Sequence, residues 1–209
     1  RMAIIKNVMA DTYVSQIKKI MKKKKYVFFD SNISLNLNII GVRKNETVSN
    51  HFDDNICVVY RNSCKEWEVF TAAATTDPGK TNLVNPPNSK GTAILLPGQY
   101  RGSHKIDLHA GKYTALRQSG NKVKVWRDND RDAYLDMEGS KIEEGYFGIN
   151  IHRASSRGET ALVNSYSAGC QVFQDVDDFY RFMELCESSA SKYGNGFTYT
   201  LLEEEDFSC

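Results

Sequence analysis

A β-strand that ends in a histidine is predicted over Gly148-Ile149-Asn150-Ile151-His152. Side chains alternate between the two faces of a strand, so Ile149 and Ile151 point one way while Asn150 and His152 point the other. The polar segment 153–169 follows, and a loop of this length is typical of a functional segment. It ends in Ser167-Ala168-Gly169-Cys170. Because a nearby base lowers the pKa of a thiol, the pattern predicts a cysteine nucleophile served by the histidine. A hydrogen-bonded surface histidine is the alternative.

The same positions resemble the catalytic signature of the YkuD-type L,D-transpeptidases. That family has a histidine, a loop of similar length, and Ser/Thr-His-Gly-Cys followed by an apolar residue and Arg or Asn. The matching residues here are His152, Ser167, Gly169 and Cys170, and the resemblance spans residues 91–173. It implies a sheet-rich α+β fold, namely a β-sandwich with helices at the N- and C-terminal ends.

The resemblance also implies a reaction, which is cysteine-dependent acyl transfer on peptidoglycan stem peptides. The Cys170 thiolate would attack the carbonyl at the third residue of the stem, and His152 would act as base and then as acid. The backbone carbonyl of Arg153 would orient the imidazole, and N–H groups near Gly169 and Cys170 would form the oxyanion hole. The implied catalytic set is Cys170, His152, Arg153, Gly169 and Ser167, and no cofactor is required.

Three positions depart from the family pattern, because Ala168 replaces the second histidine, Gln171 the apolar residue and Val172 the Arg or Asn. An isopropyl group lacks the bidentate donors that bind a substrate carboxylate. The departures favour an alternative, a non-catalytic cell-wall-binding or virion structural module that retains the fold.

Two further groups of residues are candidate ligands. His109, Tyr113 and Asn150 are predicted to line the substrate site, since the family places segment 98–118 beside it. A second pattern, Asp128, Asp130, Asp132 and Asp136, has carboxylates at positions 1, 3, 5 and 9 of a calcium loop, although the glycine and the last glutamate of such a loop are absent. A solvated hairpin tip is the alternative interpretation of these aspartates.

Composition limits the other classes of function. Apolar residues make up 41% of the 209 residues and charged residues 25%, which indicates a globular chain. A net charge of +1 argues against a nucleic-acid partner, and no apolar run approaches the ~18 residues of a membrane span. Five cysteines without a C-x-x-C pair indicate neither a disulfide framework nor a structural zinc site. Six lysines between Lys18 and Lys25 could alternatively bind a polyanion.

One domain is predicted over 1–209, with 1–90 as an N-terminal lobe of unassigned role and 91–209 as the catalytic part. Helices are expected over residues 11–24 and from Asp175 or Asp177 to Gly194. Strands are expected at 26–29, 34–40, 56–60, 67–71, 92–96, 122–126, 146–151 and 197–202.

No signal peptide is visible, although the resemblance implies action at the periplasm or cell wall. A phage-delivered or virion-associated lysin would reconcile the two observations, and a leader outside this sequence is the alternative. The pattern sets neither the oligomeric state nor the choice between transpeptidation and hydrolysis.

Overall fold

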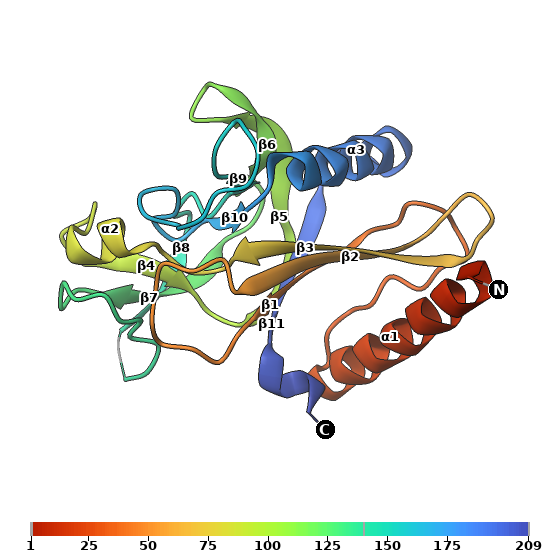
Figure 1. Cartoon of the computed structure of the whole chain (residues 1–209), viewed down its shortest axis with the longest axis horizontal. Helices are drawn as coiled ribbons and strands as arrows, with labels where there is room; N and C mark the ends of the chain where they lie inside the picture. Colours follow the sequence, from red (N-terminus) through yellow and green to blue (C-terminus); the bar gives the residue numbers. More distant parts are fainter. Residues whose placement is uncertain (1, 140, 209) are drawn as a thin grey trace.

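The structure, a computed structural model, describes residues 2–139 and 141–208, with side-chain surroundings from residue 9 onward (Figure 1). The chain is α+β and rich in strands. Its elements are α1 (Met2–Lys24), β1 (Asn38–Arg43), β2 (Asp54–Arg61), β3 (Trp67–Thr75), α2 (Lys80–Val84), β4 (Thr92–Leu95), β5 (Gly98–His109), β6 (Tyr113–Arg117), β7 (Val123–Asp128), β8 (Ile142–Gly145), β9 (Ile151–Arg153), β10 (Gln171–Phe173), α3 (Val176–Tyr193), β11 (Phe197–Glu203) and the 3-10 helix η1 (Glu204–Phe207).

The main sheet closes on itself in the order β1-β11-β5-β6-β9-β10-β3-β2, and β4, β7 and β8 form a separate sheet. The pairs β1–β11 and β9–β10 are parallel, whereas the other pairs are antiparallel. Closure differs from the predicted sandwich, and it gives every strand of the main sheet two partners, which removes exposed edges. Strands β1 to β3 precede residue 90, so the predicted N-terminal lobe and the later strands share one sheet.

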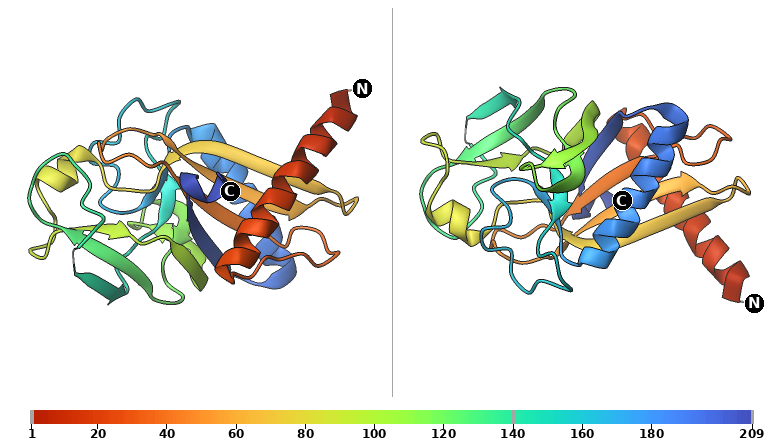
Figure 2. Two further views of the ribbon diagram at one scale, coloured as in Figure 1. Left: turned by 90° about the horizontal axis from the view of Figure 1, so that it is seen from below. Right: turned by 90° about the horizontal axis from the view of Figure 1, so that it is seen from above.

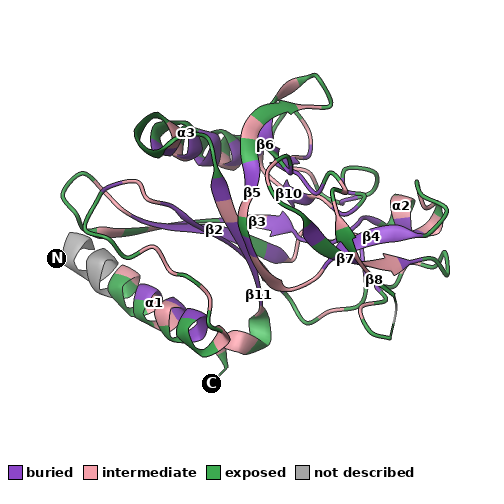
Figure 3. Ribbon diagram, turned by 180° about the vertical axis from the view of Figure 1, so that it is seen from behind, coloured by how far each residue is buried: buried purple, intermediate pink, exposed green. Residues whose placement is uncertain are grey.

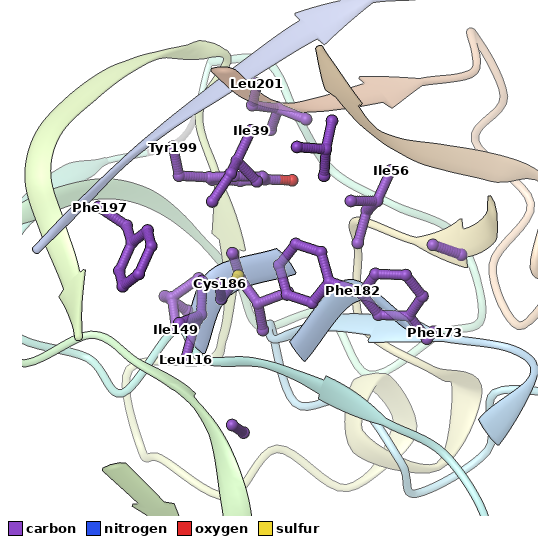
Figure 4. Packing of buried hydrophobic residues seen from close by; sticks show 14 of the residues in the cluster. Ile39, Ile56, Leu116, Ile149, Phe173, Phe182, Cys186, Phe197, Tyr199 and Leu201 are labelled. Atoms are coloured by element: carbon purple, nitrogen blue, oxygen red, sulfur yellow. The ribbon is translucent and has the colours of Figure 1, made fainter. Parts of the chain in front are cut away.

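Helix α3 packs against the main core and α1 covers the opposite side of the strands (Figure 2). Asp175 caps α3 by accepting hydrogen bonds from the N–H groups of Asp177 and Asp178, and Gly194 ends it, as predicted. Figure 4 shows Phe182 and Cys186 of α3 pointing into the cluster that contains strand residues such as Ile39, Ile56 and Tyr199.

Helix α1 buries Val14, Ile17, Ile20 and Met21 against residues of β1, β2 and β11 (Figure 3). It is longer than the predicted 11–24 segment, because residues 2–10 continue the helix and Asp11 lies within it.

Several predicted strands are confirmed with shifted ends, but those at 26–29, 34–40 and 146–151 are not formed as predicted. Residues 26–29 have no strand structure, and β1 begins only at Asn38. Asn38 in this region is 4% exposed, and its side chain bonds to the backbone of Phe29 and Val59. A side chain that satisfies backbone groups internally has no need of solvent. Sequence reasoning did not delimit β5, β6 or β8 as strands.

A buried polar cluster around Arg43 joins β1 to the start of β10. The Arg43 side chain is 2% exposed, and its guanidinium donates to Thr76 Oγ1, Thr76 O and Leu95 O at 2.9, 2.6 and 2.7 Å. Asp54 Oδ2 accepts from the hydroxyl and the N–H of Thr76, while Gln171 Nε2 donates to Thr76 O. The residue after Cys170 is thereby tied to the interior.

Replacing Arg43 with alanine should lower the free energy of unfolding by about 3–5 kcal/mol, because the buried carboxylate of Asp77, whose Oδ2 lies 3.8 Å from Arg43 Nε, would lose its cation. Urea denaturation followed by circular dichroism measures this loss. Arg117→Ala is the matched control, since its ion pair with Asp107 is exposed and should contribute less than about 1 kcal/mol. Equal losses in the two variants would contradict a structural role for the Arg43 cluster.

Candidate active site

His152 is held in one tautomer by the backbone of the next residue. Its Nδ1 lies 2.7 Å from Arg153 O. A carbonyl oxygen only accepts, so Nδ1 carries the proton and Nε2 keeps its lone pair. The residue is 4% exposed on β9, which differs from the predicted exposed strand end. The geometry leaves Nε2 as the basic nitrogen.

Tyr113 and His109 enclose the imidazole of His152. The Tyr113 hydroxyl lies 3.2 Å from His152 Nδ1 and donates to Arg153 O at 3.3 Å. The His109 ring stacks on that of His152, with centroids 4.1 Å apart and an interplanar angle of 20°. Both residues were predicted to contact substrate; the structure places them beside the histidine, because the β5–β6 hairpin pairs His109 with Tyr113 at its tip.

Asn150 was also predicted to bind substrate, but its amide is engaged within the protein. Its Oδ1 accepts from the N–H of Gln118 at 2.9 Å, and its Nδ2 donates to His109 Nδ1 at 3.0 Å. Asn150 therefore orients His109.

Residues 146–150 do not form the strand that alternation predicts, and only Ile151 to Arg153 pair as β9. The backbone groups of this segment form hydrogen bonds to side chains instead of to a neighbouring strand. Gln118 Oε1 accepts from the N–H groups of Phe147 and Ile149, and His104 Nε2 donates to Ile149 O at 2.7 Å. These contacts hold the backbone ahead of His152 in an irregular path.

The turn before Cys170 is built by Ser167 and Gly169. Ser167 Oγ donates to Cys170 O at 2.7 Å and accepts from the N–H of Gly169 at 3.1 Å. Gly169 has φ +122°, and a Cβ there would lie 2.6 Å from Ala93 O, so no other residue fits without a shift. The N–H of Gly169 is thus occupied, which contradicts its predicted part in an oxyanion hole.

The register of two parallel strands brings Cys170 toward His152. Val172 lies opposite His152, and the N–H of Gln171 donates to Asn150 O at 2.9 Å. Cys170 immediately precedes β10, and its thiol contacts the segment that leads into β9. Within the described residues, the thiol bonds to Gly148 O at 3.3 Å and not to the imidazole.

Burial keeps both members of the pair neutral at pH 7. It raises the pKa of the Cys170 thiol to about 11. Burial and the neighbouring His109 lower the pKa of His152 to about 3. The sequence predicted a thiol pKa lowered by the imidazole, and the structure contradicts this because desolvation of the half-buried cysteine outweighs any partner. Such a site would need proton transfer from sulfur to Nε2 during attack.

Alkylation of Cys170 by iodoacetamide should therefore accelerate about tenfold per pH unit between about pH 7 and 10, because the thiolate fraction rises in that proportion below the thiol pKa. His152 stays neutral over this range, so its titration adds no inflection to the profile. Quantifying the alkylated Cys170 peptide by mass spectrometry measures the rate. A plateau below about pH 8 would instead indicate a thiolate–imidazolium pair.

Three of the four predicted calcium ligands come together where β7 ends. One carboxylate oxygen each from Asp128, Asp130 and Asp136 lies within 4.8 Å of the others. Asp132 is outside this group, and its Oδ1 accepts from the N–H of Tyr134.

Two other surface features lie outside the candidate active site. Lys18 and Lys24 of the lysine-rich helix end pair with Asp30 and Asp206, so part of that charge is neutralised within the protein. A groove of about 810 Å³ between α1, β3 and α3 is lined by none of the predicted site residues.

No helix in the described part of the chain is long and apolar enough to cross a membrane.

Sequence reasoning missed Gln118, His104 and the buried amide of Gln171. Of these, only Gln171 could have been found from the sequence, because a polar side chain directly after the candidate nucleophile departs from the family pattern. In the structure its Oε1 accepts from Tyr199 OH at 2.8 Å.

Neither a family model, nor a curated protein, nor a solved structure matched this chain in the comparisons.

Proposed function

We propose that this protein is a cysteine-dependent acyltransferase of the L,D-transpeptidase type, with a YkuD-like fold, acting on peptidoglycan stem peptides. The observation that carries the proposal is the 2.7 Å contact between His152 Nδ1 and Arg153 O, on the strand beside that of Cys170. The sequence resemblance assigns the orientation of the imidazole to this carbonyl. The contact leaves Nε2 available as a base.

In the proposed reaction, sulfur of Cys170 attacks the carbonyl carbon at the third residue of the stem. The thiol proton passes to His152 Nε2, the C–S bond forms, and the tetrahedral intermediate then expels D-alanine. His152 returns the proton to the leaving amine, which leaves a thioester on Cys170. An amine of a second stem or water then releases the acyl group. The N–H of Cys170 is the donor left for the oxyanion, because those of Gly169 and Gln171 are engaged.

Arg153 is the cation that the site offers to a stem carboxylate in place of the family residue replaced by Val172. Its guanidinium lies 3.9 Å from the centroid of the Tyr113 ring. Its charge also contributes to the lowered pKa values of both His109 and His152. A planar guanidinium suits bidentate binding of a carboxylate.

Incubation of purified sacculi with the full chain, followed by mass spectrometry of the released muropeptides, tests the proposal. New 3–3 cross-links indicate transpeptidation, loss of D-alanine indicates carboxypeptidase action, and shortened cross-linked dimers indicate endopeptidase action. Unchanged muropeptides, with enzyme that is folded by circular dichroism, would contradict all three.

A non-catalytic cell-wall-binding or virion module is the second candidate. The thiol bond to Gly148 O favours it, because a thiol that donates to a carbonyl is stabilised in its neutral form. This candidate expects wild-type protein and Cys170→Ala to sediment equally with sacculi, with no product from either.

A further inference from the structure

Asp128, at the end of β7, is a buried carboxylate that forms no ion pair with any cation of the described residues. Asp128 is 1% exposed, and its Oδ2 accepts from the N–H of Asp136 at 3.0 Å. Its Oδ1 is buried and has no hydrogen-bond partner among the described residues. A buried, unpartnered carboxylate oxygen is costly, so the native state needs a compensating charge at this point.

The surroundings of Asp128 add negative charge. The neighbouring charges that act on its pKa are those of Asp136, Asp130 and Asp132, and with burial, the largest cause, they raise it to about 6. The pKa of Asp136 is raised too, by burial and by the neighbouring aspartates. Arg127, the residue before Asp128, forms an ion pair with Glu143 and is thus engaged elsewhere.

The separation of the oxygens matches one hard cation. Calcium binds oxygen at about 2.3–2.6 Å, so oxygens on opposite sides of one ion lie about 5 Å apart. The three carboxylate oxygens lie within 4.8 Å of one another. We propose that Asp128, Asp130 and Asp136 bind one calcium ion, with water completing its shell.

The ion would stabilise a loop that supports other parts of the chain. Leu135, in the middle of the loop, is 4% exposed and packs with Leu83 and Ile94. The N–H of Leu135 also donates to Thr47 O, and Ser49 Oγ donates to Ala133 O. Calcium binding is therefore expected to raise thermal stability, and it does not depend on the proposed acyl transfer.

Thermal unfolding of the full chain, stripped with a chelator and then titrated with calcium chloride, tests the site. At a calcium concentration tenfold above Kd, the Tm should rise by about 3–6 °C. Sodium chloride at matched ionic strength should raise it by less than about 1 °C, because screening alone binds no ion. Calorimetry should show saturable heat with a Kd of about 0.1–1 mM, the range of extracellular calcium modules. An unchanged Tm at about 10 mM calcium without heat, or an equal response to sodium, would overturn the site.

Substitutions separate the three ligands from their neighbour. Asp128→Asn keeps an acceptor for the N–H of Asp136, yet it should abolish the calcium-dependent rise in Tm. Asp130 is exposed, and Asp130→Asn should raise the Kd for calcium at least tenfold. Asp132→Asn is the matched control and should retain the shift. A wild-type rise in Tm with calcium in both Asp128→Asn and Asp130→Asn would overturn the proposal. Loss of the rise in Asp132→Asn to the same extent would also overturn it, because the ligands would then not be the three proposed.

Discussion

Cys170→Ala should abolish turnover of sacculi, because the proposed thioester needs the sulfur as nucleophile. The turn that presents this residue does not rely on the thiol. Ser167 bonds to the backbone of Cys170, and Gly169 supplies the positive φ of the turn. Alanine should therefore leave the turn in place and remove only the reacting atom. Muropeptide mass spectrometry with equal amounts of folded protein measures the effect.

Cys64→Ala is the matched control for this loss, since Cys64 is a free and exposed cysteine. Turnover should remain at the wild-type level. Cys57 and Cys186 are free and buried, and their replacement by alanine should act on stability and leave the chemistry largely intact. Cys209 lies outside the described residues. Turnover by Cys170→Ala within about threefold of wild type would exclude a cysteine mechanism.

His152→Ala should slow turnover by about 10² to 10⁴, the usual contribution of a positioned acid–base group. The effect is expected to be large because both partners are neutral, so sulfur has to lose its proton as it attacks. Without Nε2 that proton would pass to solvent. The rate of product formation from sacculi measures the loss, and the exposed His51→Ala should show none.

Alkylation distinguishes a missing base from a displaced cysteine in the histidine variant. Near pH 10 hydroxide generates the thiolate directly, so Cys170 in His152→Ala should still react at a rate near that of wild type. The double variant should be little worse than Cys170→Ala alone, because the two residues act as a unit. Loss of alkylation at high pH would instead mean that His152 supports the fold around the thiol.

The local patterns of the chain predicted much of the fold. The apolar spacing of α3, with Asp175 before it and Gly194 after it, was enough to place that helix. Runs of β-branched and aromatic residues located β2, β3, β7 and β11 to within a few residues. Such features depend on residues close in sequence, so they can be predicted without the structure. The closure of eight strands into one barrel depends on distant pairings, such as β1 with β11, and had no local signal.

Within the candidate site, the sequence by itself determined the residue types: a histidine with a carbonyl directly after it, and a cysteine behind a glycine turn. Only the tertiary structure decided their surroundings. It placed His109 and Tyr113 against the imidazole, engaged the N–H of Gly169, and buried the thiol so that its pKa rises to about 11. The reason is that desolvation and hydrogen-bond partners come from β5, β6 and segment 146–150, whose approach depends on the closed sheet and not on the motif.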